Sequence, residues 1–390
     1  MHKILFYVIN TFRLYCKVPC GLSLCFRVVI LKMNLQERAS LYFLHSIPGI
    51  GNKTLWKIKQ VFGSFSAGLQ ADSNRLYAFL KAAVAAEILE RRRQQDPVSA
   101  YQSFLENGLE LVCWEDDEYP VSLRTIHNAP YILYYQGRLT LVQDKSIAIV
   151  GARKASSYGR IVAHKLASEL AGAGVVIVSG MARGIDTEAH RGALETGATI
   201  AVLGSALDCP YPPENKKLYQ LIAEKSLVLS EFPPGTRPEP GNFPMRNRII
   251  CGLSRGVIVV EAGQRSGALI TADLALEQGR DVFAVPGPIN SPASIGTNHL
   301  IQQGAKLVCS VNDIVEEYPD WLIRDKMKPP AVEISGEEQD LLQHLAGEAC
   351  HIDVLMEKTG TDIGQLSTLL LRLEFQGIIR SLPGNYYVRV

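Results

Sequence analysis

The stretch VVIVSGMARGIDTEAHRGALETGATIAVLG (residues 175–204) decides the fold class. It begins and ends with short, β-branched apolar runs, and a segment with the length of a helix lies between them. Nearly continuous apolar runs are typical of parallel strands that are covered on both faces. The stretch therefore predicts one strand, helix and strand unit of an α/β sheet.

The same pattern continues on both sides of this stretch. Five further runs of the same kind lie between residues 145 and 310: SIAIVGA, LVLSE, GVIVVEA, DVFAVPG and AKLVCS. Helical stretches separate most of them. We therefore predict a doubly wound, Rossmann-like parallel sheet in a domain that spans residues 108–312. Residues 109–142 are expected to cap or extend this domain.

Residues 33–107 are predicted to form a small helical domain. The segment LHSIPGIGNKTLWKIKQVFGS places PGIG (residues 48–51) between two helical patterns, which resembles a helix-hairpin-helix, or SAM-like, domain. Gly49 and Gly51 would allow the tight turn. Backbone N–H groups at the start of the second helix would hold a phosphate, with Lys53 nearby. A purely structural turn in a helical bundle is the alternative.

The C-terminal part of the chain predicts a polar linker and a winged helix. The linker spans residues 313–336, and residues 337–390 show the order helix, helix, turn, helix and hairpin, with the hairpin turn at residues 383–385. From residue 331 onward there are 4 Lys and Arg against 9 Asp and Glu, a net charge of −5. Arg372 alone lies on the would-be recognition helix. Because phosphate binding needs cations, a protein-contact role is favoured over the reading of DNA.

The overall composition is that of a globular protein with several domains. Of the 390 residues 20% are charged and 47% hydrophobic, and the formal net charge is +1. Eight cysteines without a C-x-x-C pair indicate a reducing cytoplasm and no zinc site. Residues 1–32 are apolar, but recurring Lys and Arg interrupt them, so no membrane span is expected. We interpret these residues as an extension that precedes the folded chain at Met33.

Four loops that follow predicted strands carry the candidate binding groups. Ligands of open α/β sheets bind beyond the carboxyl ends of the strands, where helices begin. Residues 145–310 contain 17 Lys and Arg against 13 Asp and Glu, a net charge of +4. Free N–H groups, small residues and guanidinium groups would together form an anion pocket, and the expected anion is a phosphate. The candidate residues are Arg153, Ser179, Gly180, Arg183, Arg246, Asn247, Arg248, Ser266 and Gly267.

Several functional alternatives find little support in these loops. The first loop is not G-x-G-x-x-G, so no dinucleotide cofactor is expected, and neither a Walker A motif nor a nucleophile elbow occurs. Asp186 and His190 are one helical turn apart, and we interpret them as a structural pair rather than a metal site. Arg246 and Arg248 would point in different directions on a helix. One would bind the ligand, and the other would tie the pocket to Glu261 or Asp186.

The motifs of the central domain resemble those of the DNA-processing protein A (DprA/Smf) family. They are VGARKASSYGR, VSGMARGIDTEAHRGAL, TIAVLGSALDCPYPPEN, SEFPPGTRPEPGNFPMRNRIICGLS, VIVVEAGQRSGALITADLALEQGRDVFAVPG and GTNHLIQQGA. The resemblance implies a bacterial cytoplasmic protein that binds single-stranded DNA in natural transformation, loads a RecA-type recombinase and acts as a homodimer without catalytic turnover. It implies DNA contacts for Arg153, Ser179, Gly180, Arg246, Arg248, Ser266 and Gly267. The chain departs from the family at Ala155, where proline is usual.

Two other classes of function remain as alternatives. The first is a nucleotide-binding hydrolase of the lysine-decarboxylase-like Rossmann type, although the P-G-G-x-G-T stretch of those proteins is replaced here by EAGQRSG (residues 261–267). The second is an adaptor whose acidic winged helix recruits a partner.

Overall fold

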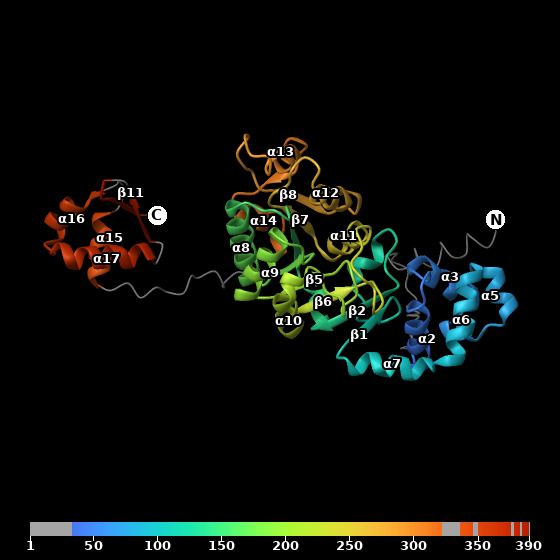
Figure 1. Ribbon diagram of the computed structural model, residues 1–390. Helices are drawn as coiled ribbons and strands as arrows, with labels where there is room; N and C mark the ends of the chain where they lie inside the picture. Colours follow the sequence, from blue (N-terminus) through green and yellow to red (C-terminus); the bar gives the residue numbers. More distant parts are fainter. Residues whose placement is uncertain (1–32, 322–335, 346–349, 376–377, 383, 390) are drawn as a thin grey trace, which may run out of the picture. The chain divides into compact units, whose positions relative to one another are not determined.

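The computed structural model describes residues 33–321, 336–345, 350–375, 378–382 and 384–389. The chain divides after Trp321 into two compact units (Figure 1). The predicted N-terminal extension, residues 1–32, lies outside the described residues, and so do residues 322–335 of the predicted linker.

A nine-stranded sheet forms the centre of the first unit, in the order β1-β2-β6-β5-β4-β3-β7-β8-β9. The seven strands from β6 to β9 are parallel to their neighbours, and β2 and β1 extend the β6 edge in antiparallel fashion. The seven predicted runs are β3 to β9, so the doubly wound parallel sheet is confirmed. The strands are β1 Glu110–Cys113, β2 Ile132–Gly137, β3 Ser146–Val150, β4 Val176–Ser179, β5 Thr199–Val202, β6 Leu227–Ser230, β7 Gly256–Val259, β8 Asp281–Ala284 and β9 Lys306–Leu307.

Helices cover both faces of the parallel strands, as the apolar runs predict (Figure 1). Alternate residues of a strand point to opposite faces. In β3, Ile147 and Ile149 therefore pack with α8 (Ser157–Gly172) and α9 (Ile185–Thr196), whereas Ala148 and Val150 pack with α11 (Asn242–Leu253) and α12 (Gly267–Glu277). The helices are α8 Ser157–Gly172, α9 Ile185–Thr196, α10 Lys216–Lys225, α11 Asn242–Leu253, α12 Gly267–Glu277 and α13 Ile295–Gln302, with 3-10 helices η1 Val121–Thr125, η2 Leu139–Gln143 and η3 Pro213–Asn215.

The strand order reverses between β3 and β7. The chain steps from β3 through β4 and β5 to β6 in one direction, and then continues from β7 to β9 on the other side of β3. The loops that follow β3 and β7 therefore separate from each other at this point. Such a switch point is where doubly wound sheets bind ligands.

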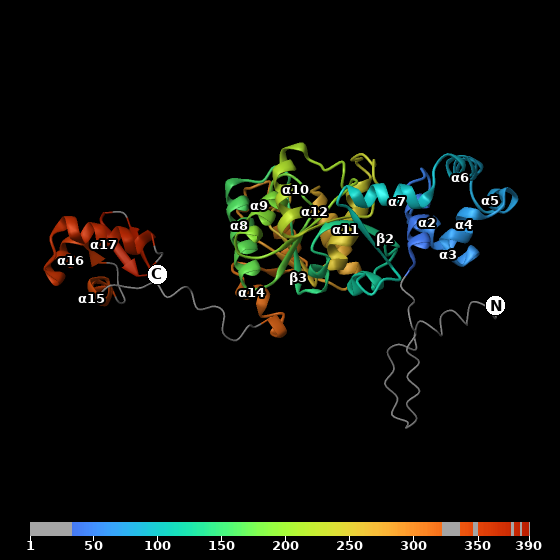
Figure 2. The ribbon, with the colours of Figure 1, turned by 90° about the horizontal axis from the view of Figure 1, so that it is seen from below.

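Six helices precede the sheet and share a hydrophobic core with it. They are α2 Leu35–His45, α3 Asn52–Phe62, α4 Phe65–Gln70, α5 Ser73–Phe79, α6 Ala82–Gln94 and α7 Pro97–Glu106. Figures 1 and 2 show them next to the edge formed by β1 and β2. Tyr42 of α2 lies with its ring centroid 4.8 Å from that of Phe104 and 6.4 Å from that of Tyr134 in β2. The buried ring nitrogen Nδ1 of His45 lies 2.8 Å from the Tyr134 hydroxyl.

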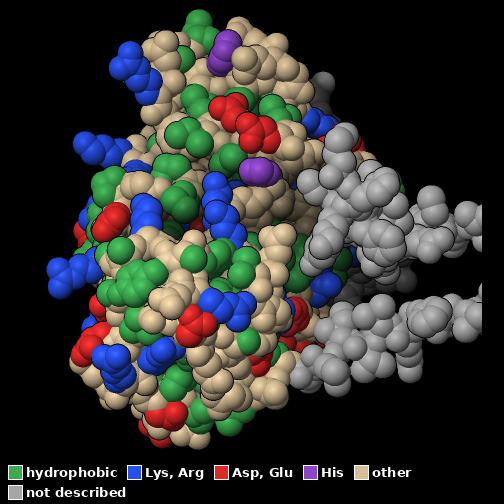
Figure 3. Space-filling model, turned by 90° about the vertical axis from the view of Figure 1, so that its right-hand side faces the viewer, with side chains coloured by type: hydrophobic (Ala, Val, Ile, Leu, Met, Phe, Trp, Pro, Cys, Tyr) green, Lys and Arg blue, Asp and Glu red, His purple; other side chains and the backbone are tan. Residues whose placement is uncertain are grey.

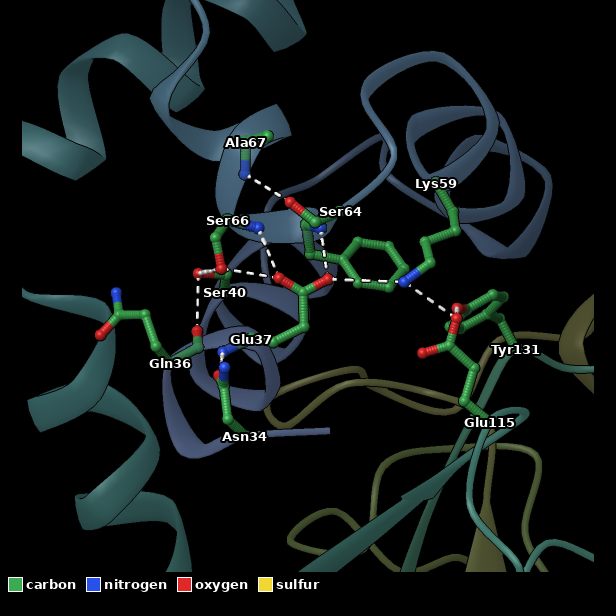
Figure 4. Close-up of polar contacts among 11 residues, drawn as sticks. Asn34, Gln36, Glu37, Ser40, Lys59, Ser64, Ser66, Ala67, Glu115 and Tyr131 are labelled. Atoms are coloured by element: carbon green, nitrogen blue, oxygen red, sulfur yellow. Dashed lines mark hydrogen bonds and ion pairs between the residues drawn. The ribbon is translucent and has the colours of Figure 1, made fainter. Parts of the chain in front are cut away.

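Polar contacts join the helices to one another, and an ion pair joins them to the sheet (Figure 4). The Glu37 carboxylate accepts hydrogen bonds from the backbone N–H groups of Phe65 and Ser66, at 2.6 and 2.9 Å, and so caps the start of α4. Lys59 Nζ lies 3.7 Å from Glu37 and 2.9 Å from Glu115, which follows β1. Figure 3 looks onto the side that carries these helices, where Lys and Arg side chains are scattered among hydrophobic and acidic ones.

The first unit extends beyond the predicted end of the central domain. Residues after 312 were expected to form a linker, yet α14 Asn312–Val315 and the 3-10 helix η4 Pro319–Trp321 follow directly. Ile314, Tyr318 and Trp321 are buried in the core on the α8 and α9 face. The packed chain therefore reaches Trp321. Among the described residues, no helix is long and apolar enough to cross a membrane.

The second unit has the order of elements predicted for a winged helix. It consists of α15 Gly336–His344, β10 Cys350–His351, α16 Ile352–Thr359, α17 Ile363–Phe375, β11 Ile379–Leu382 and β12 Tyr386–Arg389. The strands form a sheet in the order β10-β12-β11. Gly384 and Asn385 of the predicted hairpin turn both have positive φ, +85° and +59°, whereas Pro383 lies outside the described residues.

Candidate functional site

The four predicted loops meet in one crevice of about 620 Å³ at the switch point. The loop after β3 contributes Gly151 to Arg153, and the loop after β4 contributes Ala182 and Asp186. The start of α11 and the segment that joins β7 to α12 form the remaining walls. Because these loops follow neighbouring parallel strands, they leave the sheet at the same edge.

Two arginines supply the accessible positive charge of this crevice. Arg153 and Arg265 both line it, both are exposed, and neither has an ion-pair partner among the residues that the structure describes. The Arg153 guanidinium lies 5.3 Å from the ring centroid of Phe243, which also lines the crevice. Arg265 was not among the predicted site residues. Its position just before the Ser266 helix cap was the signal that could have identified it.

The N-terminus of α12 opens into the crevice. The Ser266 side chain accepts a hydrogen bond from Ala268 N at 3.3 Å and so caps the helix. A Cβ atom built on Gly267 would meet no described atom within 4 Å. The fold thus places no side chain against Gly267, and the space beside this helix start is open. Partial positive charge at a helix N-terminus favours an anion there.

Arg246 forms the buried floor of the crevice. It is 4% exposed and donates hydrogen bonds from Nη1 to the carbonyl oxygens of Gly180, at 2.6 Å, and Val202. Gly180 has no room for a side chain, because a Cβ atom would lie 2.5 Å from the guanidinium. Burial raises the pKa of the Asp186 carboxyl to about 6, although the charge of Arg246 opposes this shift. Burial also lowers the pKa of Arg246 to about 10, so removal from water outweighs the attraction between the two groups.

Arg248 points away from the crevice, as the two-residue spacing predicted. It is buried and pairs with Glu231. The predicted tie to Glu261 or Asp186 is therefore wrong for Arg248, because its side of α11 faces Glu231, the residue that follows β6. Arg183 is also outside the crevice and pairs with Glu214 at 2.7 Å.

The other predicted residues have supporting roles in the walls. The buried Ser179 hydroxyl donates to Ile149 O at 2.6 Å and so joins β4 to β3. Asn247 lines the crevice and donates from Nδ2 to Thr271 Oγ1 at 3.0 Å. The Glu261 carboxylate accepts from Ser156 N at 2.9 Å and from the Ser156 hydroxyl. Glu261 thereby fixes the first loop at the start of α8.

The expected pairing of Asp186 with His190 is wrong. Asp186 accepts hydrogen bonds from Gly180 N and Ala182 N, at 3.2 and 3.3 Å. His190 is fully buried, and its Nδ1 atom lies 2.7 Å from Thr199 Oγ1 of β5. Burial lowers the pKa of His190 to about 3, so the ring is neutral. Within the described residues, no group of three His, Cys, Asp or Glu could hold a metal ion.

The predicted hairpin joins α2 to α3 and lies against the central domain. Gly49 has a φ of +89°, and Gly51 is the N-cap residue of α3. Asn52 Oδ1 accepts from Tyr131 N at 2.7 Å, and its Nδ2 donates to Ala129 O at 2.8 Å. Gly49 and Gly51 line a second cavity, of about 530 Å³, while the exposed Lys53 lines a neighbouring one.

Comparison with known proteins agrees with this architecture. Residues 110–319 match the family model of DNA recombination-mediator protein A, and residues 325–385 match the DprA winged helix domain. The chain is 51% identical over 204 residues to DNA processing protein DprA of Streptococcus pneumoniae, which covers 52% of this chain and 72% of that protein. It is 40% identical over 285 residues to protein Smf of Escherichia coli, which covers 71% of this chain and 76% of that protein.

Two solved structures are also similar. The X-ray structure of DprA from Streptococcus pneumoniae aligns with a TM-score of 0.62 and 41% identity, over 74% of this chain and 99% of that one. DNA processing protein A from Helicobacter pylori, for which a unique single-stranded DNA binding mode is described, aligns with a TM-score of 0.50 and 32% identity, over 54% and 96%. The chain therefore belongs to the DNA recombination-mediator protein A (DprA/Smf) family, which the motifs of its central domain predicted.

Proposed function

We propose that this protein binds single-stranded DNA without regard to its sequence and mediates DNA recombination. The observation that carries the proposal is the crevice at the switch point, where two exposed arginines without ion-pair partners among the described residues flank the open N-terminus of α12. Guanidinium and backbone N–H groups bind phosphate oxygens and carry no information about the bases. A relative with 32% identity is described as binding single-stranded DNA, which supports the same ligand here.

We further propose that the protein loads a RecA-type recombinase on the bound strand as a homodimer, and that it functions in natural transformation in the cytoplasm. Family membership supports these steps. The net charge of −5 after residue 330 supports a protein-contact role for the winged helix. Recombinase filament formation on a preloaded strand, with and without residues 336–390, tests the loading step.

Asp186 lines the crevice and Glu261 precedes one of its wall segments, and the contacts of both carboxyl groups support a binding role rather than hydrolysis. Asp186 and Glu261 each accept hydrogen bonds from backbone N–H groups, so both hold loops in place. A nucleotide hydrolase would need one of them as a general acid, base or nucleophile. Incubation with nucleoside monophosphates should release no free base, and release of base would contradict the proposal.

The decisive experiment fills the crevice without altering the fold. Gly267→Leu places a side chain into open space at the start of α12, whereas the matched variant Gly267→Ala adds only one methyl group. In a fluorescence anisotropy titration with a mixed-sequence strand, Gly267→Leu should bind at least about fivefold more weakly than Gly267→Ala, because the loss of one base-stacking contact costs about 1–3 kcal/mol. Equal affinity of the two variants would refute this placement of the strand.

A further inference from the structure

A second cavity lies between the α2–α3 hairpin and the central domain. It encloses about 530 Å³ and is lined on one side by residues of the hairpin. The segment that follows β6 and the start of α11 line the other side. Several walls are apolar, among them Pro48, Phe232, Pro233 and Met245. Met245 is 51% exposed, so the cavity is open to a ligand from outside.

The polar groups of this cavity have unsatisfied hydrogen-bonding atoms. Arg248 and Glu231 line it, and each is only 8% exposed. Their ion pair uses Nη2 of Arg248 and Oε2 of Glu231. Within the described residues, Nε and Nη1 of Arg248 and Oε1 of Glu231 have no hydrogen-bond partner. Each of these atoms has almost no accessible surface, so a ligand reaches them only when the Arg248 and Glu231 side chains turn towards the cavity. Such a ligand must offer acceptors to Arg248 and a donor to Glu231.

The hairpin contributes a phosphate-binding element to the same cavity. Gly51, the N-cap residue of the 11-residue helix α3, supplies no side-chain cap to the first N–H groups of that helix. Gly51 and Asn52 line the cavity. An uncapped helix N-terminus favours an anion.

Helix α11 connects this cavity to the crevice. Phe243, Arg246 and Asn247 face the crevice, while Met245 and Arg248 face the second cavity. Neighbouring residues of a helix point about 100° apart, so one helical turn reaches both spaces. A strand that leaves the crevice across the start of α11 thus arrives at the hairpin.

We propose that this second cavity accepts one unpaired nucleobase of the bound strand, with the adjoining phosphate at the N-terminus of α3. The apolar faces of a base can pack against the apolar walls of the cavity. Its edge carries acceptors for the N–H groups of Arg248 and an N–H donor for the Glu231 carboxylate. The inference rests on the proposed function, because it assigns a further contact to the same strand. It gives the N-terminal helices a direct part in binding.

The test compares a mixed-sequence strand with a series of strands that each lack one base but keep every phosphate. The wild-type protein should bind at least one of these abasic strands about tenfold more weakly than the intact strand, the effect typical of one lost base contact. Gly51→Leu should fill the cavity and reduce binding of the intact strand to the level of that abasic strand. Gly51→Ala is the matched control and should retain the full difference, because alanine adds no oxygen that could cap the first N–H groups of α3.

Both substitutions suit the backbone at this position. Gly51 has extended φ and ψ of −104° and −176°, and an added Cβ atom would meet no described atom within 4 Å. Thermal unfolding measurements verify that both variants fold. Equal binding of all abasic strands, or wild-type affinity in Gly51→Leu, would overturn the base-binding proposal. Either result would favour a segment of a partner protein as the occupant of the cavity. Failure of the wild-type protein to bind any strand would instead overturn the proposed function.

Discussion

Replacing both Arg153 and Arg265 by glutamine should flatten the salt dependence of strand binding. These arginines line the crevice without an ion-pair partner in the described part of the chain, so each can neutralise one phosphate. For single strands, each neutralised phosphate contributes about 0.7 to the slope of log affinity against log salt concentration, so the double variant should lose about 1.4. The ratio of the wild-type affinity to that of the double variant should then be about sevenfold larger at about 50 mM salt than at about 200 mM salt.

The assay is a fluorescence anisotropy titration at four or more salt concentrations. Arg183→Gln and Lys165→Gln serve as controls. Arg183 is already neutralised by Glu214, and Lys165 is an exposed residue of α8 whose partner is Glu169. Both should retain the wild-type slope. An unchanged slope in the double variant, or an equal loss of slope in Arg183→Gln, would refute the assignment of phosphate contacts to the two unpaired arginines.

Three further substitutions or conditions test other parts of the site. Affinity for the strand should rise as the pH falls through about 6, because Asp186 loses its negative charge there; the gain between pH 7.5 and pH 5 is at most about 30-fold. Asp186→Asn should abolish this dependence in the same titration. Arg248→Met should lower the free energy of unfolding in urea by about 3–5 kcal/mol, because Glu231 is left buried and charged; adding Glu231→Gln should recover part of the loss. Gly184→Ala should cost more than about 1 kcal/mol by the same measurement, since Gly184 has a φ of +77° and a Cβ atom would lie 2.3 Å from Ala152 O. Wild-type stability in either variant would contradict the local geometry described above.

The sheet and the place of the crevice could be predicted from the sequence because both depend on regular spacing. Strands covered on both faces leave apolar runs that are nearly continuous, and parallel strands bring their loops to one edge. The four loops accordingly meet in the crevice. The 3.6-residue period of a helix also predicted correctly that Arg246 and Arg248 point in different directions.

The partners of individual side chains could not be predicted in this way. Arg248 lies on α11, which leads into β7, whereas its partner Glu231 follows β6. In the sheet β5, β4 and β3 lie between β6 and β7, and no local pattern links the two residues. His190 contacts Thr199 rather than Asp186, because its helix position places it over β5. Arg265 was missed for another reason. Its position before the Ser266 cap marks it as a candidate, but the absence of an ion pair among the described residues, which leaves its charge available, is visible only in the folded chain.

The aromatic contacts between the N-terminal helices and β2 have a consequence for how the chain can be divided. Tyr42 and Phe104 lie against Tyr134, and all three belong to one continuous core. A truncation that starts at Leu109 would remove Tyr42 and Phe104 and expose Tyr134 and its apolar neighbours in β1 and β2 to water, which favours aggregation. In limited proteolysis and unfolding experiments, residues 33–321 should therefore behave as one cooperative unit, and the helices should not unfold independently of the sheet.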